Sequence, residues 1–82
     1  MMDVRVRLSA GLAQQLGTTR LTVQLDNDAT VADLLTHLRT LHPSLAQRLE
    51  TAVPVVAGRH VPQTEPLADG QEVALLVPIA GG

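Results

Sequence analysis

The stretch "DNDATVADLLTHLRTLHP" at residues 26–43 predicts the main helix of the chain, and the fold follows from it. Thr30 is suited to the N-cap, because its hydroxyl can accept a hydrogen bond from the first helical turn, where Asp33 is also favourably placed. Pro43 disfavours a helical conformation at His42 and ends the helix. The apolar side chains recur at the spacing of one helical face: Val31, Leu34, Leu35, Leu38 and Leu41. We expect an amphipathic helix from about Thr30 to Leu41.

The segments before this helix predict two strands. "DVRVRL" (3–8) and "RLTVQL" (20–25) both alternate apolar and polar residues, which is typical of half-buried strands. Because they lie close together in the sequence, we expect them to pair antiparallel. The connection between them, "LSAGLAQQLG" (8–17), predicts a short helical turn that closes at its final glycine.

Further elements are expected after the main helix. Ser44 and Gln47 resemble a second capping box, which would open a shorter helix that ends at about Leu49. "VPVVAGRHV" (53–61) indicates two short strands around a tight glycine turn. Pro54 favours an edge position or a strand start, because proline has no backbone N–H to donate.

The last predicted strand decides the architecture. "PLADGQEVALLVP" (66–78) contains an Asp69-Gly70 turn followed by a strand that is apolar on both faces. One face would carry Val73, Leu75 and Val77, and the other Ala74, Leu76 and Pro78. A final strand of this kind belongs in the centre of a sheet, covered by the helix on one side and free for a partner on the other. We therefore expect an α+β protein of the β-grasp (ubiquitin-like) type, with one main helix packed on a mixed sheet. The helix stripe would face Val4, Val6, Val23 and Leu75.

Composition limits the function. A chain of 82 residues predicts a single domain, residues 1–82, with residues 79–82 as an extended C-terminal tail. The formal net charge is −2 and there are no aromatic residues, so nucleic acid is not an expected ligand. No apolar run approaches the roughly 20 residues of a membrane span, and no signal-peptide pattern opens the chain, so we expect no membrane contact and a cytoplasmic location. The absence of cysteine excludes disulfides, thiolate catalysis and iron–sulfur clusters.

No residue pattern predicts an active site. His37 and His42 are five positions apart and would lie on different helical faces, and His60 lies beside a turn, so no metal site is expected. Ser9 and Ser44 have no nucleophile-elbow or triad context. The internal glycines are isolated and form no phosphate-binding loop. We expect that this chain is not an enzyme.

The chain ends in "LLVPIAGG" (75–82), which raises the question of what two terminal glycines are for. The four residues after Pro78 extend roughly 13 Å, enough to reach a recessed site in another protein. Gly81 and Gly82 have no Cβ, so a narrow channel would admit them. A terminal carboxylate is chemically inert until another molecule activates it.

Four stretches together resemble the MoaD/ThiS family of ubiquitin-like sulfur carriers: "ATVADLLTHL", "LHPSLAQRL", "PLADGQEVALLVP" and "LVPIAGG". The resemblance covers nearly the whole chain and is greatest to the small subunits of molybdopterin synthase. The chain departs from the family pattern at three places. Val77-Pro78 stands where a double proline is frequent, Leu8-Ser9 where an aromatic residue is frequent after the first strand, and Ala57-Gly58 where Asn-Gly is frequent.

The resemblance implies a carrier mechanism without a bound cofactor. An adenylyltransferase of the ubiquitin-activating type would use ATP to convert the Gly82 carboxylate to an acyl-adenylate. A persulfide sulfur donor would then leave a thiocarboxylate on Gly82, and the large subunit of molybdopterin synthase would receive the sulfur. Ile79, Ala80 and Gly81 would pass through the partner's channel. Leu76, with Pro78, would contact the partner, because exposed apolar surface at this place indicates an interface.

Three alternatives remain open from the sequence. The chain could be a ubiquitin-like modifier that is conjugated to other proteins through Gly82. It could supply sulfur for thiamine, for tRNA thiolation or for cysteine synthesis instead of molybdopterin. It could also be a β-grasp interaction domain with an incidental tail.

Overall fold

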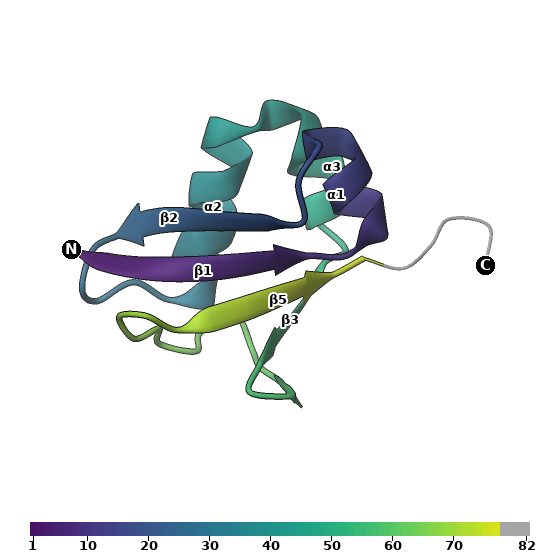
Figure 1. The fold of residues 1–82 in the computed structure, drawn as a ribbon. Helices are drawn as coiled ribbons and strands as arrows, with labels where there is room; N and C mark the ends of the chain where they lie inside the picture. The colour runs from purple at the N-terminus through teal and green to yellow at the C-terminus, as the bar shows by residue number, and fades with distance from the viewer. Residues whose placement is uncertain (78–82) are drawn as a thin grey trace.

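The computed structural model describes residues 1–77. Strands, helices and one 3-10 helix (η1) follow one another along the chain in Figure 1. Their bounds are β1 Met2–Leu8, α1 Ala10–Leu16, β2 Arg20–Leu25, α2 Val31–Leu41, η1 Pro43–Leu45, α3 Ala46–Leu49, β3 Val53–Val56, β4 Arg59–His60 and β5 Glu72–Leu76.

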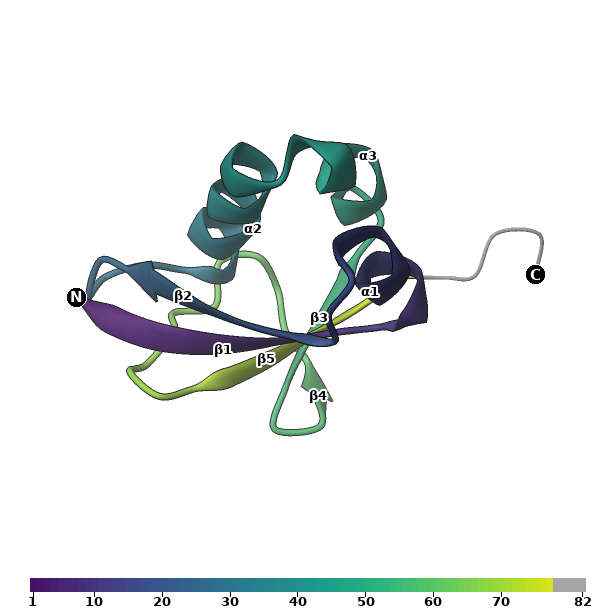
Figure 2. The ribbon, with the colours of Figure 1, turned by 45° about the horizontal axis from the view of Figure 1, so that its top comes forward.

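The strands form one mixed sheet in the order β2-β1-β5-β3-β4. β1 pairs antiparallel with β2, as the sequence predicted, and parallel with β5. β3 is antiparallel to both β5 and β4. The final strand is therefore central, and the predicted α+β architecture is confirmed. Figure 2 shows α1, α2 and α3 on one side of the sheet.

The core is aliphatic and lies between α2 and the sheet. The inward side chains of β1 and β5, such as Val4, Val6 and Leu75, are fully or almost fully buried together with Leu34, Leu35 and Leu38 of α2. The predicted packing of the helix stripe on these strands is confirmed. One member of the stripe was predicted wrongly. Leu41 is 52% exposed, because it is the last residue of α2 and lies about 80° around the helix from Val31, at the margin of the apolar face.

The start of α2 is a complete capping box. The Thr30 hydroxyl accepts a hydrogen bond from the Asp33 N–H at 3.4 Å, and an Asp33 carboxylate oxygen accepts one from the Thr30 N–H at 2.9 Å. The second predicted box, Ser44 with Gln47, is wrong. Pro43 opens a 3-10 helix that already contains Ser44, and neither η1 nor α3 has a side-chain cap.

Two glycine turns close where the sequence predicted them. Gly17 ends α1 with a φ of 77°, and its N–H donates to the Ala13 carbonyl. Between β3 and β4, Ala57 and Gly58 both have positive φ, 52° and 76°, as in a type I′ hairpin turn.

Pro54 does not lie on an edge strand, because β4 forms that edge of the sheet. Pro54 is instead the second residue of β3, in agreement with the alternative expectation of a strand start. Its carbonyl accepts from the Val61 N–H just beyond the two-residue strand β4. Because N–H and C=O of a strand residue point the same way, the missing proline donor faces the end of β4 and leaves the pairing with β5 intact.

Candidate functional site

The face of the sheet opposite to the helices carries the outward side chains of the central strand β5. Val73 and Leu75 are fully buried against the helices, whereas Glu72 and Leu76 are exposed and Ala74 is half-buried. This alternation confirms the predicted parity of the strand. It places Leu76 on the open face, immediately before Val77, the last described residue.

Four side chains form an apolar area on this face, which we call the open-face patch: Val53, Val55, Ala74 and Leu76. Val53 pairs with Leu76 and Val55 pairs with Ala74, so the four lie side by side on β3 and β5. Leu76 is 47% exposed, and the other three are half-buried. A surface hollow of about 260 Å³ adjoins Leu76 and Ala74, and it is also lined by Arg7, Leu8 and Ser9.

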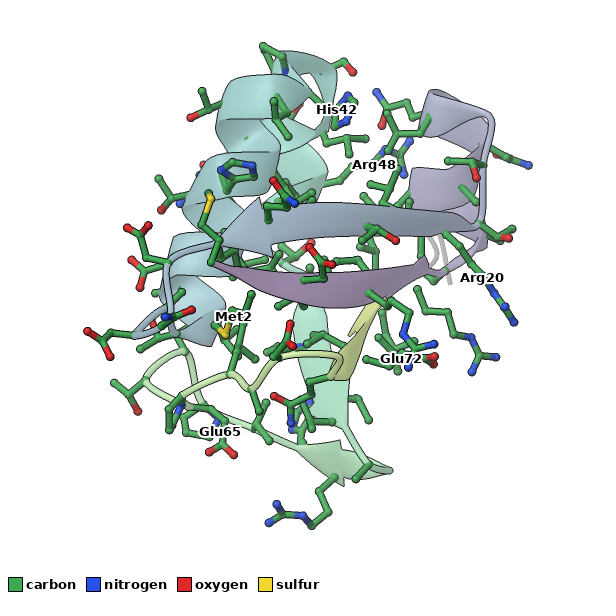
Figure 3. The ribbon with its side chains drawn as sticks, turned by 60° about the vertical axis from the view of Figure 1, so that its left-hand side comes forward. Met2, Arg20, His42, Arg48, Glu65 and Glu72 are labelled. Atoms are coloured by element: carbon green, nitrogen blue, oxygen red, sulfur yellow. The ribbon has the colours of Figure 1, made fainter. Side chains whose placement is uncertain are left out.

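Arginines border the open-face patch on the β1 side. Arg7 pairs with Ala74 of β5 on one side and with Arg20 of β2 on the other. Two like charges directly opposite each other destabilise a strand pair. The Glu72 carboxylate lies 3.6 Å from the Arg7 guanidinium and offsets part of this repulsion. Figure 3 shows Arg20 and Glu72 on the side of the sheet away from α2, whereas Met2 lies toward α2.

A side-chain hydrogen bond holds the backbone directly after β5. The Ser9 hydroxyl oxygen accepts from the Val77 N–H at 3.0 Å, and the Ser9 N–H donates to the Leu75 carbonyl at 3.1 Å. The predicted tail and contact residues that follow lie outside the described residues: Pro78, Ile79, Ala80, Gly81 and Gly82. Their roles, and the division into a domain 1–82 with a tail 79–82, stay predictions.

A larger hollow, of about 540 Å³, lies at the opposite end of the β1–β2 pair. Its lining includes Asp26, Asp28, Asp33 and His37. Within residues 1–77 no three His, Asp or Glu side chains are arranged to hold a metal ion. The hollow is far from the open-face patch along the strands, so it plays no part in the candidate site.

The helices in the described part of the chain are short. The longest, α2, has 11 residues, and none has both the length and the apolarity needed to cross a membrane.

Comparison with known families identifies the chain. The model of the ThiS family matches residues 6–82, a range that includes the two terminal glycines. The chain belongs to the ThiS family. It is thus a carrier protein of the MoaD/ThiS type and not an enzyme, as the sequence predicted.

Two curated relatives span almost the full length. The molybdopterin synthase sulfur carrier subunit of Chlamydomonas reinhardtii is 34% identical, over 99% of this chain and 100% of the relative. The small archaeal modifier protein 1 of Haloferax volcanii is 36% identical, over 93% of this chain and 97% of the relative.

Solved structures confirm the fold. A crystal structure of the Haloferax volcanii small archaeal modifier protein 1 superposes with a TM-score of 0.86 at 30% identity, covering 96% of this chain and 100% of that one. A complex of subunits 1 and 2 of the molybdopterin-converting factor of Helicobacter pylori contains a chain with the same fold. It has a TM-score of 0.70 at 23% identity and covers 99% of this chain and 100% of that one. The β-grasp fold expected from the sequence is thereby confirmed.

Sequence reasoning missed two parts of this site. Val53 and Val55 are predicted only as strand residues, although "VPVV" is apolar on both faces, the same signal that indicates a contact surface at Leu76. The sequence around Ser9 excludes a nucleophile and predicts no other role for its hydroxyl. Its partner Val77 is 68 positions away, and no local pattern carries such a contact.

Proposed function

We propose that this chain carries sulfur on the Gly82 carboxylate for the synthesis of molybdopterin. The observation that carries the proposal is that the ThiS match extends through residue 82. The full-length similarity to a molybdopterin synthase sulfur carrier subunit favours molybdopterin as the product over thiamine, thiolated tRNA or cysteine. A cytoplasmic location agrees with this role and stays a prediction.

The chemistry begins with activation of an unreactive group. The Gly82 carboxylate attacks the α-phosphorus of ATP on an adenylyltransferase of the ubiquitin-activating type, and pyrophosphate leaves. The terminal sulfur of a persulfide donor then attacks the acyl carbon, and AMP leaves. A second thiol cleaves the resulting S–S bond, so that a thiocarboxylate remains on Gly82. The large subunit of molybdopterin synthase would position this sulfur against its acceptor.

The open-face patch is the surface on which the adenylyltransferase and the large subunit of molybdopterin synthase would each dock. It joins Leu76, one of the large apolar side chains that are exposed among residues 1–77, to three half-buried neighbours on the strand that leads to the tail. A partner bound there would hold the start of the tail at a fixed place. Residues 79–82 would then be able to reach the channel of the same partner.

The test uses a chain extended by one alanine after Gly82. The parent, incubated with the cognate adenylyltransferase, ATP and a persulfide donor, should gain the mass difference between one sulfur and one oxygen atom. The extended variant should stay unmodified, because its reactive carboxylate has moved one residue outward and carries a methyl group into the channel. Its circular dichroism spectrum and melting temperature should match those of the parent. Equal conversion of the two proteins, or none in the parent, would refute the proposal.

The alternative is conjugation to other proteins, which the similarity to the small archaeal modifier protein 1 favours. The two functions share activation and differ in the acceptor, which is a pterin precursor in one case and a lysine amine in the other. The chain has no lysine, so none of its side chains offers an amine for conjugation of the chain to itself. Deleting the gene should abolish molybdoenzyme activity if the main proposal holds. Covalent adducts of a tagged chain in its own cells, without loss of molybdoenzyme activity, would establish the modifier instead.

A further inference from the structure

Ser9 lies at the start of α1, where a serine hydroxyl commonly caps the helix, but the hydroxyl of Ser9 does not do so. It is the N-cap residue of α1, with φ −68° and ψ 167°. A serine at this position ordinarily accepts a hydrogen bond from an N–H in the first helical turn. In this chain α1 has no such side-chain cap, and the Ser9 hydroxyl accepts from the Val77 N–H at 3.0 Å instead.

The ends of the strands explain why a side chain is needed. The β1–β5 pairing ends at Leu8 opposite Leu75, since the chain then turns into α1. The Ser9 N–H still donates to the Leu75 carbonyl, but the Ser9 carbonyl turns away and accepts from the Ala13 N–H. No backbone oxygen of β1 is therefore left for Val77. The hydroxyl replaces the absent strand carbonyl.

Val77 is the residue at which such a restraint has the largest effect on the tail. Pro78 follows it and has no backbone N–H, so the Val77 N–H is the last backbone donor before residue 79. Pro78 also disfavours a helical conformation at Val77. The hydrogen bond and the proline together fix the backbone where the described structure ends.

We propose that Ser9 is a positioning residue for the Gly82 carboxylate. By holding Val77, it sets the point and direction from which residues 78–82 enter the active site of the adenylating partner. This inference rests on the proposed carrier function. A reacting group that is delivered in one orientation reacts faster than one that must search for it, and small misplacements are costly.

The experiment compares Ser9→Ala, which removes the acceptor, with Ser9→Thr, which keeps a hydroxyl. Ser44→Ala is the matched control, because Ser44 is exposed and it is its backbone carbonyl, not its hydroxyl, that accepts a hydrogen bond from the Gln15 side chain. The first readout is amide hydrogen exchange by NMR in the full chain. In Ser9→Ala the protection of the Val77 amide should fall roughly two- to tenfold, the factor that one net hydrogen bond supports. The amides of Val73 and Leu75 should keep their protection.

The second readout is the adenylation step itself, followed as ATP–pyrophosphate exchange on the purified cognate adenylyltransferase. For Ser9→Ala we expect kcat to fall about tenfold or more while KM stays within about twofold, because the four side chains of the open-face patch are unchanged and the carboxylate is misplaced. Ser9→Thr should restore both readouts, and Ser44→Ala should equal the parent. If Ser9→Ala does not fold, Ser9→Cys keeps the side-chain shape with a much weaker acceptor.

The inference would be overturned by unchanged Val77 exchange in Ser9→Ala, by an unchanged kcat, or by a rise in KM alone, which would assign Ser9 to docking. A Ser9→Thr variant as impaired as Ser9→Ala would also overturn it. Failure of the carrier function itself is distinguishable, because the parent protein would then gain no sulfur-for-oxygen mass difference in the conversion assay, whereas ATP–pyrophosphate exchange reports only the activation step.

Discussion

At the scale of single residues, the leucines of α2 share one helical spacing but differ in burial. Leu35 and Leu38 are almost fully buried, whereas Leu41 follows the same spacing and is 52% exposed. We expect Leu35→Ala or Leu38→Ala to lower the free energy of unfolding by about 2–5 kcal/mol, since each leaves a cavity in the core. Leu41→Ala should cost less than about 1 kcal/mol, because little transfer from water is lost. Urea denaturation followed by circular dichroism measures both, and equal losses at positions 38 and 41 would contradict the core assignment.

Leu76 tests the open-face patch at the same scale. Leu76→Arg should fold as the parent does, because the side chain is already 47% exposed. It should weaken binding to the adenylyltransferase by at least about tenfold, since a charge would be buried at the contact.

The control for this variant is Leu41→Arg, the same change at another exposed leucine outside the patch. It should bind as the parent does. Surface plasmon resonance gives the affinities, and circular dichroism checks the fold. A Leu76→Arg protein that unfolds would show that the outward parity of Leu76 is wrong.

At the scale of elements, the β3–β4 hairpin contains a residue in an unfavourable conformation. Ala57 has a φ of 52° in a turn that prefers Asn or Gly there. Holding a residue with a Cβ in this region costs about 1–2 kcal/mol. Ala57→Asn should therefore raise the free energy of unfolding by up to about 1 kcal/mol. Ala68→Asn, in an exposed loop outside the positive-φ positions, is the control and should give no gain. A loss of stability in Ala57→Asn would mean that the turn is not of type I′.

At the scale of the whole molecule, charge is unevenly distributed. The Arg7–Arg20 pair lies at one end of β1 and β2, beside the open-face patch, while the aspartates of the larger hollow lie at the other end. A partner that docks on the patch should thus present carboxylates to the arginines. Opposite charges at the rim of an interface mainly accelerate association.

Arg7→Gln and Arg20→Gln should each reduce the association rate with the adenylyltransferase several-fold and weaken its dependence on salt. The dissociation rate should change little. Arg39→Gln removes the same charge from α2, on the helical side of the sheet, and should leave the association rate as it is. Stopped-flow mixing at two salt concentrations measures these rates. An equal effect of Arg39→Gln would show that net charge, not this face, governs association.

The sequence was sufficient for features that depend on neighbouring residues. The alternation of "DVRVRL" and "EVALL" predicted which side chains of β1 and β5 face inward, and Thr30 with Asp33 predicted the start of α2. Ser44 was misassigned because the capping pattern is present but Pro43 starts a tighter helix one residue earlier. The contact of Ser9 with Val77 could not be predicted, because the two residues come together only when β1 and β5, which are far apart in the sequence, have paired.

The central position of β5 also has a consequence for biosynthesis. β1 leaves the ribosome before β5, yet one of the two edges of β1 stays unpaired until residues 72–76 of β5 have been made. The hairpin of β1 and β2 cannot bury its inner face alone, and hairpins in isolation are at best marginally stable in water. A chain interrupted before residue 72 would therefore lack the centre of its sheet and remain open to proteolysis. An incomplete chain would therefore not fold and could not occupy the adenylyltransferase, because the open-face patch forms only after β5 has been made.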